Sequence, residues 1–100
     1  MLLHILNKSP KNTSITQQCL NALLPGDKLI LIEDGVYQAL PTTTMNPLLD
    51  ALQIKGEIYV LEADVISRGL QNRLSEQVKL ATFEDFVTLT EACTHTLTWA

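Results

Sequence analysis

Two cysteines are the residues of this chain best suited to nucleophilic or sulfur-transfer chemistry. Cys19 shares one face of a predicted helix with Ile15, Ala22 and Leu23, because their spacing follows the helical repeat. Its thiol could carry a sulfur atom as a persulfide, or it could serve as a small apolar core residue. From the residues alone we favour the core interpretation, since free cysteine is among the most buried residue types. Moreover, no Lys or Arg lies near Cys19 in the helix to lower the thiol pKa.

Cys93 and the histidines offer weaker chemistry. Cys93 lies near the end of the last predicted helix, where the negative end of the helix dipole disfavours a thiolate. Cys93 and His95 are too few for a zinc site, which needs three or four protein ligands, so we expect no metal. His4 lies within an apolar strand, and we interpret it as a core or interface histidine rather than a catalytic base.

Two carboxylates and a glycine follow the most apolar segment of the chain, residues 29–32. Polar groups just past the carboxyl end of a buried parallel strand lie where doubly wound folds place their chemistry. Glu33 and Asp34 could therefore bind a metal or polarise a substrate. The simpler interpretation, which we favour, is that Asp34 caps the next turn and Gly35 supplies an unusual backbone angle.

Phosphate-binding loops are missing from the sequence. The loop at residues 7–13 contains no glycine, no G-x-G-x-x-G follows the first predicted strand, and no P-loop occurs. A flavin or nucleotide phosphate normally needs such a cradle. We therefore expect no cofactor, and a stand-alone flavin- or nucleotide-binding module remains a less favoured alternative.

The elements that must position these residues alternate between strand and helix. Strands are predicted at residues 2–6, 28–32, 57–61 and 78–81, and short helical segments at 36–40, 48–53 and 63–68. A capping box at Ser14 and Gln17 predicts the start of the first long helix. The pattern predicts an α/β fold with three layers and a mostly parallel sheet of about four to five strands, as one domain over residues 1–100.

The last long helix is predicted to begin at a second capping box, formed by Thr82 and Asp85. Its inward face is expected to consist of four residues: Phe83, Phe86, Val87 and Thr90. Residues 94–100 are expected to form a tail.

The composition limits the classes of function. Hydrophobic residues make up 46% of the chain and charged residues only 18%, which is an apolar excess for so short a domain. We infer that other chains cover part of this surface in an oligomer. The net charge of −4 disfavours direct nucleic-acid binding. Because neither a signal peptide nor a membrane span is apparent, we expect a cytoplasmic protein.

Several motifs, in order along nearly the whole chain, resemble those of the TusB/DsrH family. They are residues 3–10 (LHILNKSP), residues 31–37 (LIEDGVY) and Leu61 followed by Asp64, Arg68 and Gly69; residues 85–90 and a tryptophan near the end complete the set. Thr82-Phe83 replaces an Asp-Tyr pair common in the family, and either Thr or Asp can cap the helix.

The resemblance implies a small flavodoxin-like (DsrE/DsrF/DsrH-like) domain in a cytoplasmic sulfur relay. In such a relay, TusB, TusC and TusD chains form a heterohexamer, a dimer of heterotrimers. The complex passes persulfide sulfur through a TusE-like carrier toward 2-thiolation of the tRNA wobble uridine, so direct tRNA binding by this chain is not expected. The resemblance also leaves open a DsrH-type subunit of a dissimilatory sulfur-oxidation complex.

The resemblance bears directly on Cys19. The main sulfur-carrying cysteine of the family belongs to the D-type subunit, and the B-type chain is mainly structural and accessory. DsrH-like members nevertheless carry a cysteine in the first helix, where Cys19 lies here. Cys19 is therefore the candidate sulfur carrier of this chain, and a neighbouring subunit would have to provide the positive charge that activates it.

Overall fold

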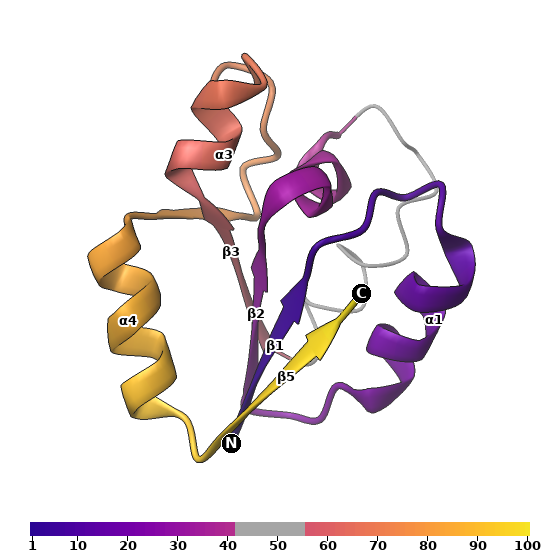
Figure 1. Ribbon diagram of the computed structural model, residues 1–100, viewed down its shortest axis with the longest axis vertical. Coiled ribbons are helices and arrows are strands. Elements are labelled where there is room, and N and C mark those ends of the chain that lie inside the picture. Colours follow the sequence, from indigo (N-terminus) through magenta and orange to yellow (C-terminus); the bar gives the residue numbers. More distant parts are fainter. Residues whose placement is uncertain (42–55) are drawn as a thin grey trace.

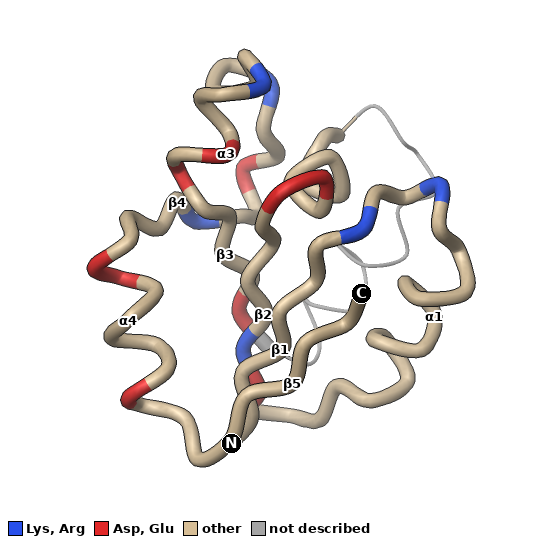
Figure 2. Tube along the Cα trace, viewed as in Figure 1, with Lys and Arg blue, Asp and Glu red and all other residues tan. Residues whose placement is uncertain are grey.

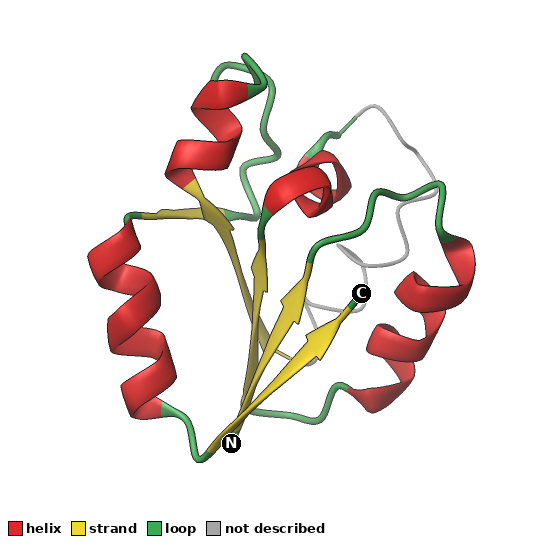
Figure 3. Cartoon of the chain, in the orientation of Figure 1, coloured by secondary structure: helices red, strands yellow, loops and turns green. Residues whose placement is uncertain are grey.

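The computed structural model describes residues 1–41 and 56–100. In this part of the chain five parallel strands form one sheet, in the order β4-β3-β2-β1-β5 (Figures 1 and 3). The strands are β1 (Leu2–Leu6), β2 (Asp27–Leu31), β3 (Gly56–Leu61), β4 (Lys79–Ala81) and β5 (His95–Trp99). The predicted α/β fold with a parallel sheet is confirmed.

Helices cover both faces of the sheet. Helix α1 (Thr13–Ala22) lies against one face and helix α4 (Phe83–Ala92) against the other, which gives the three predicted layers (Figure 1). The 3-10 helix η1 (Glu33–Ala39) follows β2, and helix α3 (Glu62–Ser67) follows β3. Both therefore lie at the carboxyl edge of the sheet.

Two neighbouring inner strands, β1 and β2, supply side chains to both cores. On the α1 side, Leu6, Leu29 and Leu31 pack with the buried residues of α1. On the α4 side, Leu3 and Ile30 pack with residues that include Leu89 of α4. A strand whose two faces are both covered must be apolar at consecutive positions, which explains the run at residues 29–32.

Strand β5 corrects the expectation of a C-terminal tail. It pairs in parallel with β1, in a register that places Leu6 opposite Trp99. The hydroxyl of Thr94 and its backbone N–H both donate to the carbonyl of Met1, at 2.8 and 2.9 Å. The alternation of threonine with leucine and tryptophan in β5 is a strand pattern, but the segment is short and lies at the sheet edge.

Helix α1 begins two residues earlier than predicted. Its N-cap is Asn12, whose side-chain oxygen accepts a hydrogen bond from the backbone N–H of Ile15 at 3.1 Å. Ser14 lies within the helix, so the capping box predicted for it does not form. Asparagine is at least as good an N-cap as serine, and this explains the earlier start.

The inward face predicted for the last helix is also wrong. The capping box of Thr82 and Asp85 forms as predicted. However, Leu89 is the buried residue of α4, while Phe83, Val87 and Thr90 are exposed and Phe86 is only partly buried. The predicted short helix at residues 48–53 and most of the preceding loop lie outside the described residues.

Candidate functional site

Cys19 lies deep in the core on the α1 side of the sheet. Its side chain is fully buried in a cluster that includes Leu20 and Leu23 of the same helix. Burial raises the pKa of the Cys19 thiol to about 12, because a thiolate would lose its hydration there. At neutral pH the residue is therefore a thiol and not a nucleophilic thiolate.

The position of Cys19 in α1 adds no activation. With Asn12 as the N-cap, Cys19 is the seventh residue of the helix, beyond the first turn over which the helix dipole acts. The neighbouring buried positions on the helix are Thr16 and Leu20. The Thr16 hydroxyl donates to the Asn12 carbonyl at 2.9 Å and accepts from the Gln38 side chain at 2.9 Å. Apolar packing thus holds the helix to the sheet, and a neutral hydrogen-bond chain joins it to Gln38 of η1.

At the carboxyl edge of β2, the structure corrects two predicted roles. Gly35 does not supply the unusual backbone angle; Glu33 does, with φ of 51°. Gly35 is needed for space, because a Cβ atom there would lie 2.1 Å from the carbonyl oxygen of Leu6. Asp34 makes no side-chain cap to η1. Instead, it accepts hydrogen bonds from the Arg68 side chain at 3.1 and 3.3 Å.

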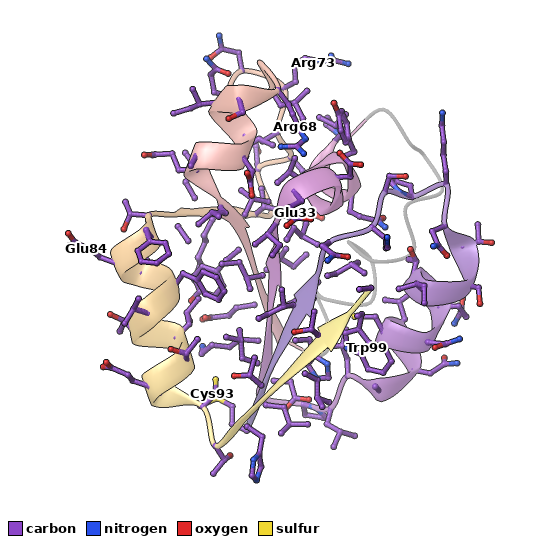
Figure 4. All side chains as sticks on the ribbon, viewed as in Figure 1. Glu33, Arg68, Arg73, Glu84, Cys93 and Trp99 are labelled. Atoms are coloured by element: carbon purple, nitrogen blue, oxygen red, sulfur yellow. The ribbon has the colours of Figure 1, made fainter. Side chains whose placement is uncertain are left out.

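Arg68 joins η1 to α3 at this edge. Besides Asp34, its guanidinium lies 3.6 Å from the carboxylate of Asp64, which is four positions earlier on α3. The Asp64 carboxylate also accepts the backbone N–H of Glu33 at 2.7 Å, which holds the residue with positive φ in place. Figure 4 shows Arg68 between the two helical segments, above Glu33. Arg68 thus pairs with both aspartates, which favours a scaffold role for the group.

An open cavity of about 530 Å³ lies beside this edge, next to the loop that precedes α1. Its lining consists of Ser9, Pro10, Lys11, Asp34, Tyr37 and Leu40. The charged groups of Lys11 and Asp34 accompany a mostly apolar wall. Cys19 is not among the described residues that line this cavity, so the thiol and the cavity are separate.

His4 is a buried core residue, as predicted, and its partners come from distant parts of the sequence. Its Nε2 lies 2.9 Å from the Asp27 carboxylate, and the Trp99 indole donates to its Nδ1 at 3.1 Å. Because an indole N–H can only donate, Nδ1 must be the acceptor, and Nε2 carries the hydrogen that points to Asp27. Burial alone would raise the pKa of Asp27. Hydrogen bonds from the backbone N–H groups of Leu2 and Leu24 and from His4 outweigh this effect, so the pKa is lowered.

A second charged cluster lies on the α4 side of the sheet. The Glu57 carboxylate accepts from Lys28 at 2.7 Å, from the Tyr59 hydroxyl and from Lys79 at 3.4 Å. These bonds, led by the one from Lys28, lower the pKa of Glu57 to about 2. Burial and the neighbouring Glu57 raise the pKa of Tyr59 to about 12. Both ammonium groups lie within 6 Å of the Tyr59 ring centroid, at 5.9 and 5.7 Å.

Sequence reasoning missed both clusters because their members come together only through strand register. The pairs His4↔Leu29 and Lys28↔Glu57 follow from β1–β2 and β2–β3 pairing. The one local signal was a charged residue, Asp27, directly before an apolar strand. Within the described residues, no group of three or more His, Cys, Asp or Glu side chains could hold a metal ion. Nor do they include a helix long and apolar enough to cross a membrane.

Comparisons with known proteins point to one family. Residues 8–96 match the family model described as DsrH like protein. The protein named TusB of Escherichia fergusonii is 36% identical over 98 residues, which is 98% of this chain and 100% of that protein. TusB of Escherichia coli is 35% identical over the same share of both chains.

A solved structure has the same fold. The crystal structure of the YchN protein from E. coli superimposes with a TM-score of 0.79 and covers 97% of each chain. At 18% sequence identity, this likeness establishes the fold alone.

Proposed function

The chain belongs to the TusB/DsrH family, and from this premise we propose that it is a subunit of a sulfur relay that serves 2-thiolation of the tRNA wobble uridine. The observation that carries the proposal is the match to TusB proteins at 35–36% identity over 98% of the chain. The net charge of −4 fits a subunit that passes sulfur between proteins and leaves tRNA binding to another component.

Within the relay, we assign the chain a mainly structural role as an accessory, non-catalytic subunit. A sulfur carrier needs an accessible thiolate, which attacks a persulfide and is later attacked in turn. Cys19 is fully buried and burial raises its thiol pKa to about 12. Both observations support a packing role in the free chain. Sulfur transfer through Cys19 would require α1 to separate from the sheet.

The partners that this role implies are TusC-like and TusD-like homologous subunits, in a heterohexamer built as a dimer of heterotrimers. A TusE-like protein would be the downstream carrier. The apolar excess of the chain supports a subunit of an assembly, because an apolar surface that stays in water is unfavourable. A DsrH-type role in a dissimilatory sulfur-oxidation complex is the second candidate, favoured by the first-helix cysteine and by the family model that matches.

Native mass spectrometry of the tagged chain, purified gently from its own cells, tests the assembly. We expect two companion chains of similar size at equal stoichiometry. A lone monomer or a homo-oligomer would contradict the proposal. Identification of the companions separates the two candidates, since sulfite-reductase subunits would indicate the dissimilatory complex.

The role of Cys19 is tested by Cys19→Ser, with Cys93→Ser as the matched control. If the chain is structural, 2-thiouridine in cellular tRNA stays at the wild-type level in both variants. Loss of 2-thiouridine in the Cys19 variant alone, with the complex intact by native mass, would instead assign sulfur transfer to Cys19.

A further inference from the structure

The outer surface of α4 carries large apolar side chains that the chain itself does not cover. Phe83 is 72% exposed and Val87 is 41% exposed. The two residues are four positions apart, so they lie on the same face of the helix, one turn from each other. They belong to the set that the sequence pattern predicts to be an inward face.

The side of α4 that faces the sheet uses other residues. Leu89 and, just past the helix, Cys93 are buried against the sheet, and Figure 4 shows Cys93 at the foot of the helix. Phe86 lies between the two sides. Its ring meets that of Phe83 edge to face, with centroids 6.5 Å apart and an interplanar angle of 83°. The two rings thus extend from the core to the surface, and Phe86 supports the exposed ring of Phe83.

The charged residues of α4 itself all have one sign, while the neighbouring Lys79 on β4 is bonded to Glu57. Helix α4 contains Glu84, Asp85 and Glu91 and no Lys or Arg, and in Figure 2 it is drawn in tan and red without blue. Asp85 is engaged in the capping box. Figure 4 shows Glu84 directed away from the sheet. The surface is therefore an apolar stripe with an acidic rim.

The charge pattern decides which partner fits. In a symmetric contact between two copies of α4, the same patch meets itself, and the acidic rims would repel each other. An anionic lipid surface would repel the rim as well. A chain with an apolar patch bordered by Lys or Arg would bury Phe83 and Val87 and would neutralise the acids.

We propose that α4 is the docking surface for a non-identical subunit of the relay, which covers Phe83 and Val87 with apolar side chains and places basic residues against Glu84 and Glu91. This inference rests on the proposed function and adds to it the surface and the chemistry of one partner. The capping box and the burial of Leu89 hold the helix ready for docking, so binding does not need to order it.

The test uses the complex formed with the C-type and D-type chains of the same organism. Phe83→Ala and Val87→Ala are compared with Leu97→Ala, a matched control because Leu97 on β5 is also 41% exposed. We expect Phe83→Ala to weaken the affinity for the partner by on the order of 30-fold, as for a central aromatic anchor. Leu97→Ala should change it by less than about 3-fold, as most interface or surface truncations do. The unfolding midpoint of each free variant verifies that the fold is intact.

A charge reversal tests the basic partner. Glu84→Lys should weaken association, and the remaining affinity should depend less on salt than that of the wild type. If Phe83→Ala and Glu84→Lys both leave the affinity unchanged while the complex forms, the docking surface is refuted and the proposed function stands.

Two other outcomes would also refute the inference. If the wild-type chain forms a homodimer that Phe83→Ala abolishes, the occupant is a second copy. If the wild-type chain binds neither relay subunit, the docking inference and the proposed function fail together.

Discussion

Helices α1 and α4 have the same length, ten residues each, but they use their apolar residues differently. Helix α1 buries Cys19, Leu20 and, just past its end, Leu23 in the larger core. Helix α4 buries Leu89 and leaves Phe83 exposed. Helix α1 completes the core of its own chain, whereas α4 packs through Leu89 and partly through Phe86 and leaves Phe83 and Val87 on its outer side. A similar helical pattern in sequence can therefore place apolar side chains either in the interior or on the surface of the chain.

The largest difference should appear in core truncations. Leu23→Ala is expected to lower the free energy of unfolding by about 2–5 kcal/mol, because Leu23 is fully buried at the end of α1. Val87→Ala on α4 should change it by no more than about 0.5 kcal/mol in the free chain. Urea unfolding of both variants checks this. Similar losses in the two variants would show that α4 packs on its own chain as firmly as α1 does.

A smaller difference concerns the reactivity of the Cys19 thiol. In a Cys93→Ser background, alkylation of native Cys19 at pH 8 should be slower than in the urea-unfolded chain by on the order of a hundredfold or more. The reason is that burial removes access and raises the thiol pKa to about 12. Mass spectrometry of iodoacetamide labelling gives both rates. Comparable rates would mean that α1 opens readily and would revive Cys19 as a sulfur carrier.

The smallest expected effect is a change in the acid sensitivity of the α4 side. Hydrogen bonds from Lys28 and Tyr59 lower the pKa of Glu57 to about 2. The ionised Glu57 carboxylate therefore stabilises the fold at pH values above the ordinary carboxyl pKa. This contribution is lost as the pH falls from about 4.5 toward 2. Glu57→Gln should therefore flatten the decline of the urea midpoint over this range. Asp27, on the α1 side of the sheet, also has a lowered pKa and contributes to the decline that remains. If the urea midpoint of Glu57→Gln declines with pH as steeply as that of the wild type, Glu57 does not contribute to the acid sensitivity.

Much of the fold was predictable, because buried parallel strands and capped helices leave strong local patterns. The apolar runs located β1, β2 and β3 to within one residue, and the capping box of Thr82 and Asp85 located the start of α4. Strand β5 was missed, since five residues at a sheet edge carry little hydrophobic signal. Helical periodicity identified the apolar stripe of Phe83 and Val87 but could not tell whether it faces the core or another chain.

The site was less predictable than the fold, because its contacts join distant segments. Gly35 was singled out for its backbone freedom, yet its role depends on the approach of Leu6 from another strand. The bond between His4 and Asp27 depends on how β1 and β2 are paired. Cys19 was correctly placed on a core-facing helix, but only the structure reveals that no part of its side chain reaches water.

The pairing of β5 with β1 also bears on how the sheet forms, because it joins the two ends of the sequence. Thr94 and Met1, which meet where the two strands begin, are 93 positions apart. Closing so long a loop costs chain entropy before any contact repays it, and long-range pairings of this kind slow folding. The pairs β1–β2 and β2–β3 span far shorter loops and can form first. Until β5 docks, the backbone groups along one flank of β1 are unpaired, and the hydrogen bond from Trp99 to His4 has not formed. We therefore expect β5 to dock late, onto a flank of β1 that becomes interior to the sheet only at that step.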